Sequence, residues 1–364
     1  MKRTATVQSI NGSNVNITFT IPESLASNTA CTIVYPASAA NGANTGADVA
    51  TALAAQDGTI GNFPEVRVGT ATIDKDNHSL SSVTKLAAQN AIFKLTLKNI
   101  DATADVSATS VKIYNQANTL LTTVTPASGY DKVMYVALPT TATTLKFAVT
   151  DGTTNYFNMA SGLSLGTNFY QSTIELATVG DVIMSTGKCA KAGTAGAVAM
   201  IAYLGNASDC ANGLAIALED VSSNPLSWNN SGDYNGGKTA AQWCSAWNTS
   251  KAVTGGTWHF PSAKDWQYMF IGCGSGESYS DPYKEMTKNY SGLKDKLSAA
   301  GGTALKSGTF EFYWSSTEYD PGVEAWFLSF RDGSSASFRY ISESLSYNDY
   351  VLLYYFYVRA CLAF

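Results

Sequence analysis

Residues 313–364 read YWSSTEYDPGVEAWFLSFRDGSSASFRYISESLSYNDYVLLYYFYVRACLAF and combine two kinds of sequence. Trp314-Ser315-Ser316, Ala325-Trp326, Asp332-Gly333 and Val358-Arg359-Ala360 are typical of a framework, with core aromatics, a hairpin turn and an anchoring strand. Between them, residues 317–357 contain seven Tyr, seven Ser and no Lys. Antibody combining sites use the same pair, because Tyr offers a large, stiff contact surface and Ser adapts to polar neighbours. The segment therefore predicts a recognition surface mounted on a framework.

A purely structural interpretation of the same segment is also open. Residues 351–358 form a continuous run of apolar and aromatic residues, which fits a central strand covered on both faces. The preceding residues argue against a core, because serines alternate there with apolar and charged residues. These serines are Ser334, Ser335, Ser337, Ser342, Ser344 and Ser346.

The composition of the 364-residue chain predicts two domains, or three, of a β-rich secreted or surface-exposed protein. Only 14% of its residues are charged, against roughly 25% in typical soluble proteins, and Asn, Ser, Thr, Gly and Ala replace them. The net charge of −5 is spread thinly, without the basic stripe that neutralises phosphates. No nucleic-acid partner is expected.

The sequence has no window of about 18 apolar residues that would span a bilayer. Met1-Lys2-Arg3 leads into polar sequence rather than into the apolar core of a signal peptide. Either the protein is cytoplasmic or its export signal is missing from this sequence.

The cysteines do not indicate a disulfide scaffold or a zinc site. Cys31 stands alone in the first half, and an odd number falls in the second, so at least one buried thiol is expected there. The sequence contains no CxxC motif, and its two histidines, His78 and His259, are far apart. No metal site is therefore predicted. The second-half cysteines are Cys189, Cys210, Cys244, Cys273 and Cys361.

The first half alternates apolar and polar residues as half-buried strands do. Phe93, Leu95 and Leu97 share one face of a predicted strand. Turn residues such as Asn11-Gly12 and Asp151-Gly152 separate the runs, which predicts an antiparallel β-sandwich. A short helix is expected over 47–56, and no residues form a catalytic pattern. The strands are predicted at 15–20, 32–35, 66–73, 91–98, 111–114, 133–138, 145–149 and 169–176.

Several of these runs resemble the fimbrillin-type domains of Bacteroidales pilins and related lipoproteins. The similarity is carried by residues 93–100, by Val111-Lys112-Ile113-Tyr114, by LKFAVTDGTTNYF and by Gly166-Thr167-Asn168-Phe169-Tyr170 leading to residues 173–176. It implies a fimbrillin-like domain over 1–177. It also implies export as a lipoprotein and display at the outer membrane or on a fimbria, with the signal trimmed and any membrane contact made through a lipid anchor outside this sequence.

The second half mixes strands and helices after a boundary near residues 177–181. Strands are predicted at 197–204 and 213–218, and helices at 239–247 and from about 283 to 300. Another helix should begin after Pro261, because Ser262 is a good N-cap and Asp265 can complete a capping box.

The segments GTWHFPSAKDWQYM and YWSSTEYDPGVEAWFLSFRDG, followed by the terminal VRACLAF, resemble a C-type lectin fold. They are most similar to the branch in bacterial surface proteins called the major paralogous domain. The resemblance implies an α+β C-type lectin-like domain over 178–364. Its framework residues would be Trp258, Trp266, Trp314, Trp326 and Arg359.

Within that branch, the C-terminal ending resembles the variable proteins of diversity-generating retroelements. In those proteins an error-prone reverse transcriptase rewrites adenine-bearing codons, and Tyr, Ser, Asp, Phe, Leu and Val are frequent products. The resemblance implies a variable ligand-binding segment over about 317–357. The positions it implies are Tyr319, Asp320, Phe327, Ser329, Arg331, Ser334, Ser335, Ser337, Tyr340, Ser342, Tyr347, Asp349, Leu352, Tyr354 and Tyr355.

The sequence departs from two functions that the lectin fold supports elsewhere. It lacks the acidic-Pro-Asn and Trp-Asn-Asp signatures through which animal C-type lectins bind calcium and sugar. It also lacks the reactive cysteine pair of the formylglycine-generating oxidase. No cofactor and no enzymatic activity are therefore expected.

The predicted function is ligand binding at the cell surface, as a pilus-tip adhesin or receptor. The ligand would be a protein or glycan on another cell, a phage or a host surface, and pilin subunits are further candidate partners. Two alternatives remain, a structural pilin or surface subunit and a fixed polysaccharide-binding module without diversification.

Overall fold

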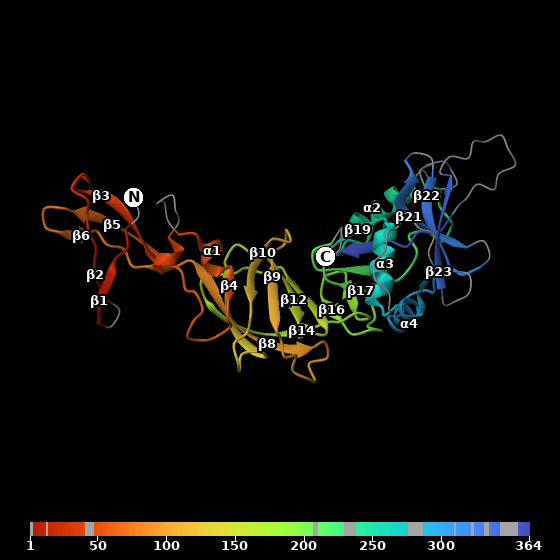
Figure 1. The fold of residues 1–364 in the computed structure, drawn as a ribbon, viewed down its shortest axis with the longest axis horizontal. Helices are drawn as coiled ribbons and strands as arrows, with labels where there is room; N and C mark the ends of the chain where they lie inside the picture. Colours follow the sequence, from red (N-terminus) through yellow and green to blue (C-terminus); the bar gives the residue numbers. More distant parts are fainter. Residues whose placement is uncertain are drawn as a thin grey trace.

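The computed structural model of the chain is mostly β-sheet, with 44% of residues in strands and 13% in helices. It describes residues 3–11, 14–40, 47–206, 210–228, 238–275, 287–308, 311–321, 324–330, 335–342 and 356–364. Figure 1 shows an elongated molecule, with the N-terminal strands at one end and strands β21–β23 at the other. The C-terminus lies near the middle of the molecule, between the N-terminal part of the chain and the C-terminal part.

The described residues at the N-terminal end form two small sheets. Strands β1 (Thr6–Asn11) and β2 (Asn14–Thr18) form an antiparallel hairpin whose Val7 and Ile10 are exposed. A second sheet has the order β3-β5-β6, with β7 also paired to β5. Its strands are β3 (Thr29–Tyr35), β5 (Arg67–Asp74), β6 (Ser79–Ser81) and β7 (Ala87–Ala88).

Two sheets pack face to face in the middle of the molecule and form the middle sandwich. The first has the order β13-β12-β9-β10-β4 and the second β11-β8-β14. Phe93, Leu95 and Leu97 of β8 lie in the core between them, as the alternation predicted. The strands are β4 (Ala55–Gln56), β8 (Asn90–Asn99), β9 (Ser110–Tyr114), β10 (Leu120–Val124), β11 (Val133–Pro139), β12 (Thr144–Thr150), β13 (Asn155–Ser161) and β14 (Phe169–Leu176).

The sequence interpretation of the first half needs two corrections. The predicted antiparallel sandwich contains parallel pairs, because β14 runs parallel to β8 and β4 parallel to β10. The predicted single sandwich is also preceded by the separate N-terminal sheets. The predicted strands are confirmed, and the helix expected over 47–56 is the shorter α1 (Val49–Leu53), which follows the 3-10 turn η1 (Ala37–Ala39).

The described residues of the C-terminal lobe, which begins near Val182, form two antiparallel sheets and three helices. The larger sheet has the order β16-β15-β17-β18-β24-β19, and the smaller β20-β23-β22-β21. Strand β14 therefore belongs to the middle sandwich and β15 to the C-terminal lobe, on either side of the boundary predicted near residues 177–181. That the two parts are independent domains stays a prediction. The strands are β15 (Val182–Met184), β16 (Cys189–Ala190), β17 (Ala197–Leu204), β18 (Gly213–Ala217), β19 (Thr257–His259), β20 (Thr287–Asn289), β21 (Phe312–Asp320), β22 (Glu324–Ser329), β23 (Ser335–Ser342) and β24 (Cys361–Ala363).

The helices of this lobe begin at side chains that satisfy their first amide groups. Thr239 and Gln242 form a capping box at α2 (Ala240–Ser250), and Ser262 and Asp265 form the predicted one at α3 (Ala263–Gly272). The predicted helix from about 283 is wrong at its start. Helix α4 (Ser291–Ala299) begins later, because Thr287–Asn289 instead pair as strand β20 with β23.

The middle sandwich and the C-terminal lobe share a packed junction. Phe157 of β13 lies 4.5 Å from the ring of the C-terminal Phe364, and both belong to one hydrophobic cluster. The buried Lys146 of β12 donates a 2.7 Å hydrogen bond to the Gly255 carbonyl and a 2.6 Å bond to Asn118 Oδ1. A Lys191–Asp101 ion pair closes the rim at 2.8 Å.

Candidate functional site

The sheet β20-β23-β22-β21 carries most of the predicted binding segment that the structure describes. In β21, burial falls from Trp314, 1% exposed, to Tyr319, 39% exposed, and the neighbouring Asp320 is also exposed. The Tyr319 ring stands edge-on to the buried Trp326 ring of β22, with centroids 5.5 Å apart and planes at 78°. An exposed aromatic held by a core aromatic is a rigid contact group of the kind that the sequence predicts.

Phe327 and Ser329 are not on this surface, contrary to the prediction, because they are only 6% and 2% exposed. Strand β22 is covered on both faces. On one face, the ring of Phe327 lies 4.9 Å from the Phe356 ring, in the hydrophobic cluster that also contains Phe157 and Phe364. On the other face, Trp326 and Leu328 belong to a separate hydrophobic cluster. A strand between two cores has no solvent-facing side, so this correction follows from sheet position.

Strand β23 holds the next group of predicted residues. Ser337 is partly exposed and pairs in register with Ser329, and the neighbouring Arg339 is exposed. For Ser335, Tyr340 and Ser342 the structure describes the backbone in β23. The remaining predicted positions lie outside the described residues, namely Arg331, Ser334, Tyr347, Asp349, Leu352, Tyr354 and Tyr355.

The five predicted framework residues are all buried, Trp258 to 2% exposure, Trp314 to 1%, and Trp266, Trp326 and Arg359 to 0%. Trp314 Nε1 donates to the Leu226 carbonyl at 2.8 Å, and Trp258 Nε1 to the Lys251 carbonyl at 2.7 Å. These bonds satisfy the polar edges of two core aromatics.

Arg359 is the centre of a buried polar network. Its Nε donates to Asp220 Oδ1 at 2.7 Å, and its guanidinium also reaches the carbonyls of Ala217 and Thr303 at 3.2 Å. The Tyr313 hydroxyl donates to the same Asp220 carboxylate at 3.1 Å. Asp220 is therefore a structural partner of Arg359 and Tyr313. This network fixes the chain where it returns from residues 317–357 to the core.

A cluster of chemically reactive side chains, His259, Asp265 and Cys361, was missed at the sequence level. The His259 Nε2 atom lies 2.9 Å from Cys361 Sγ and 3.3 Å from Asp265 Oδ2. Burial raises the pKa of Asp265, but hydrogen bonds from His259 and Ser262 outweigh it and hold the pKa below its usual value. The three residues are spread over more than 100 positions of sequence, so no spacing motif could show them.

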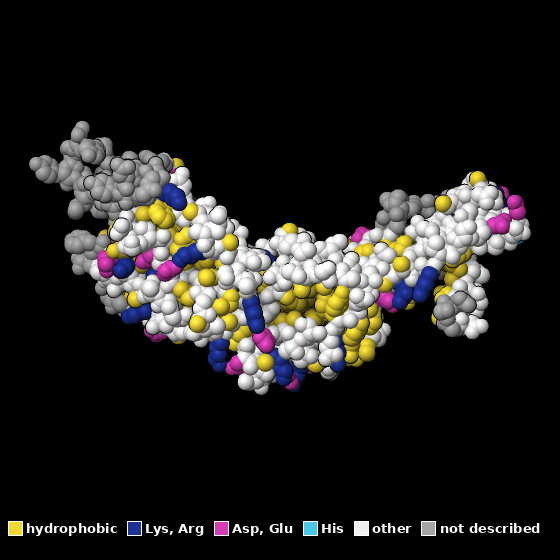
Figure 2. All heavy atoms as spheres, turned by 180° about the vertical axis from the view of Figure 1, so that it is seen from behind, with side chains coloured by type: hydrophobic (Ala, Val, Ile, Leu, Met, Phe, Trp, Pro, Cys, Tyr) yellow, Lys and Arg dark blue, Asp and Glu magenta, His cyan; other side chains and the backbone are white. Residues whose placement is uncertain are grey.

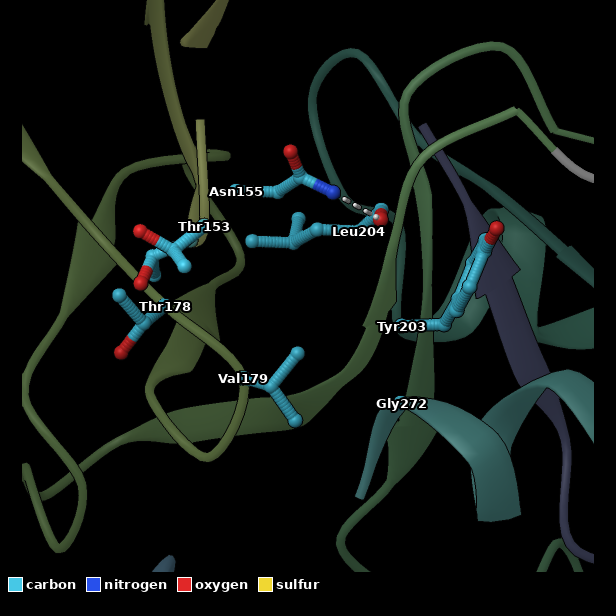
Figure 3. Close-up of a pocket in the computed structure, with 8 residues that line it drawn as sticks. Thr153, Asn155, Thr178, Val179, Tyr203, Leu204 and Gly272 are labelled. Carbon is cyan, nitrogen blue, oxygen red and sulfur yellow. Dashed lines mark hydrogen bonds between the residues drawn. The ribbon is translucent and has the colours of Figure 1, made fainter. Parts of the chain in front are cut away.

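A hollow of about 370 Å³ lies at the junction of the two lobes, away from these residues. Figure 3 shows Asn155 turned toward the Leu204 carbonyl, to which it donates a 3.3 Å hydrogen bond. The walls that the described residues form carry hydroxyl, carboxamide and apolar groups, without a carboxylate, amine or imidazole. The lining residues are Thr153, Thr154, Asn155, Thr178, Val179, Tyr203, Leu204 and Gly272.

The six cysteines, all within the described chain, are thiols rather than disulfides, and the five in the second half are buried. This confirms the buried thiol expected there. Burial raises the pKa of Cys189 to about 12. In the face shown in Figure 2, charged side chains are scattered, and hydrophobic ones gather over the middle of the molecule. Of the helices that the structure describes, none is long and apolar enough to cross a membrane.

No protein-family model matches the chain, and no curated protein matches it either. Among solved structures, a fimbrial protein from Bacteroides ovatus ATCC 8483 is similar at 12% identity and a TM-score of 0.29. The alignment covers 82% of this chain and 76% of that chain. A TM-score of this size does not establish a shared fold, so the architecture depends on the strands and helices described above.

Proposed function

We propose that the chain is a surface-displayed protein whose C-terminal lobe binds a protein or glycan through residues 317–357. The observation that carries the proposal is the exposed Tyr319 at the tip of β21, supported by the buried Trp326. It is the kind of contact group expected of the Tyr- and Ser-rich segment. The elongated arrangement in Figure 1 supports display, because β21–β23 lie at the end opposite to the N-terminal strands.

The proposal includes sequence diversification and the two domain types. The C-terminal lobe would have a C-type lectin-like fold and the middle sandwich a fimbrillin-like fold, with export through a lipid anchor. A diversified surface must change without unfolding its support. Trp314, Trp326 and Arg359 are buried in the same lobe that exposes Tyr319 and Asp320, which is consistent with that requirement.

Binding is tested by replacing Tyr319, Tyr347, Tyr354 and Tyr355 together with Ala. A few aromatic anchors usually carry most of the affinity of an interface. The quadruple variant should therefore lose at least about tenfold of the wild-type binding to an array of glycans and purified surface proteins. Its melting temperature should stay within a few degrees of the wild type. Tyr35→Ala, which removes an exposed tyrosine at the other end of the molecule, is the control and should retain binding.

Diversification has a separate test in the DNA that follows the gene. A reverse transcriptase gene and a near-identical copy of the segment encoding residues 317–357 are expected there. If neither is present, the segment is a fixed binding surface.

A structural pilin or surface subunit is the second candidate, favoured by the burial of Phe327 and Ser329. It predicts that the tyrosines of the segment pack against the protein rather than face solvent. The quadruple variant would then unfold at a much lower temperature, because truncating a buried aromatic costs about 3–5 kcal/mol.

A further inference from the structure

Three potential metal ligands meet where β19, β24 and α3 come together. His259 of β19 pairs directly with Cys361 of β24, so both side chains leave the sheet on the same face. Helix α3 starts four residues after His259 and brings Asp265 to the same place. One ligand atom from each residue lies within 4.8 Å of the other two.

Two potential metal ligands approach the same nitrogen of His259. Cys361 Sγ and Asp265 Oδ2 both approach this one nitrogen, at 2.9 and 3.3 Å. A single N–H group can align well with only one of two acceptors, whereas an ion placed between the three atoms contacts all of them.

The Asp265 carboxylate is oriented by the protein but only half satisfied. Its Oδ2 accepts hydrogen bonds from Ser262 N at 2.8 Å and from Ser262 Oγ at 2.7 Å. Its Oδ1 is buried and has no hydrogen-bond partner among the described residues. Burying a charged carboxylate with one oxygen unpartnered is costly, and a cation bound to this carboxylate would offset the cost of burying its charge. The bonds from Ser262 are the kind of outer contacts that hold a metal ligand in place.

We propose that His259, Asp265 and Cys361 bind one divalent transition-metal ion, and the ligand set selects Zn²⁺. Thiolate and imidazole suit zinc, whereas Ca²⁺ and Mg²⁺ take oxygen ligands. Tetrahedral zinc separates such ligand atoms by about 3.3–3.6 Å, which the histidine–aspartate contact already matches and which requires the Cys361–His259 contact to widen by about 0.6 Å. On binding, the Cys361 thiol loses its proton to water.

The site is reached from the His259 side. The His259 side chain is 26% exposed, whereas Asp265 and Cys361 are fully buried. Three protein ligands leave a fourth position for water or another ligand.

The ion would hold together the two ends of the 317–357 segment. At its start, Thr317 Oγ1 accepts a 2.9 Å hydrogen bond from the Ala263 amide of α3, and Ser316 N donates to Pro261 O at 2.8 Å. At its end the chain returns through Arg359 to Cys361. A metal bound to Cys361 and Asp265 would therefore fasten the end of the segment to the turn of α3 that already holds its start.

The test uses the full chain after treatment with a chelator, titrated with Zn²⁺ alone and with Co²⁺ as a spectroscopic probe. One zinc ion should bind per chain and raise the melting temperature by several degrees. Cobalt should give the visible bands of a tetrahedral site and a near-ultraviolet thiolate-to-metal charge-transfer band, whereas Ca²⁺ should change neither spectrum nor stability.

The variants Cys361→Ser, His259→Gln and Asp265→Asn should each weaken zinc binding at least about 100-fold. Cys31→Ser and His78→Gln change the same residue types outside the C-terminal lobe and should bind zinc as the wild type does. If the wild-type protein shows no thiolate-to-cobalt band, or if Cys361→Ser retains full zinc affinity, the proposal is wrong. The wild-type spectrum decides even if a variant fails to fold.

Discussion

At the scale of single residues, Arg359 shows how a buried charge can hold the framework. It is 0% exposed, and its Nε donates to Asp220 at 2.7 Å. Removing one partner of such a pair leaves the other charge buried without compensation. We expect Arg359→Met to lower the free energy of unfolding by about 3–5 kcal/mol in urea titrations. Arg339→Met, at an exposed position of β23, should change it by less than about 0.5 kcal/mol. Equal effects would mean that the network adds nothing to stability.

Lys146 is a buried cation of another kind, because its two recorded acceptors are the uncharged oxygens of Asn118 and Gly255. Burial lowers the pKa of Lys146 to about 8 in the folded protein, from the ordinary value of 10.5. The folded chain therefore releases this proton before the unfolded chain does. Between these pH values the Lys146 contribution to stability rises with pH, and below pH 8 it is constant.

The pH dependence is measured as the difference in unfolding free energy between the wild type and Lys146→Met. That difference should shift in favour of the wild type by about 2 kcal/mol between pH 8 and 9.5. The comparison cancels the titration of the other groups that both proteins contain. A difference that stays flat over this range would show that the ammonium group keeps its ordinary pKa.

At the scale of elements, local chemistry made some predictions secure. Ser262 and Asp265 predicted the start of α3, because a capping box depends only on residues three apart. Alternation predicted β8, β9, β11 and β12. The helix expected from residue 283 was wrong at its start because Thr287–Asn289 pair with β23, which is a tertiary interaction. Burial of Phe327 and Ser329 likewise depends on what covers each face of β22.

The candidate metal cluster shows the same limit. His259 and Cys361 are paired across neighbouring strands, although they are 102 residues apart in the chain. Sequence motifs for metal sites depend on ligands that are close together along the chain. His259 and Cys361 are not, so no motif in the sequence indicated a metal site. The residues predicted for the binding segment also differ in whether local sequence could indicate their exposure. Its composition pointed to Tyr319, whereas sheet position excluded Phe327.

At the scale of the whole molecule, the middle sandwich and the C-terminal lobe meet at close-packed glycines. A Cβ atom on Gly187 would lie 2.3 Å from the Thr254 carbonyl oxygen and 2.7 Å from Met159 Cε of β13. Gly187→Ala should therefore destabilise the protein, both through its positive φ of +81° and through these contacts. Gly129 has nearly the same φ, +83°, but open space where its Cβ would be, so Gly129→Ala is a matched control.

Thermal melts of the two variants separate the effects. The positive φ alone should cost about 1–2 kcal/mol in each protein, and crowding should add at least about 2 kcal/mol in Gly187→Ala. Similar melting temperatures for the two variants would mean that the residues around Gly187 move aside without loss of stability. The middle sandwich and the C-terminal lobe would then be only loosely packed together.

The central claim is that the tyrosines of residues 317–357 face solvent above a buried framework. Hydroxyl-radical footprinting with mass spectrometry measures this directly, by comparing the oxidation rates of Tyr347, Tyr354 and Tyr355 with two internal references. Tyr313, 0% exposed, and Tyr319, 39% exposed, provide the buried and exposed rates within the same lobe. The proposed binding surface predicts rates at or above that of Tyr319 for all three tyrosines. Rates as slow as that of Tyr313 would contradict it and would favour the structural subunit.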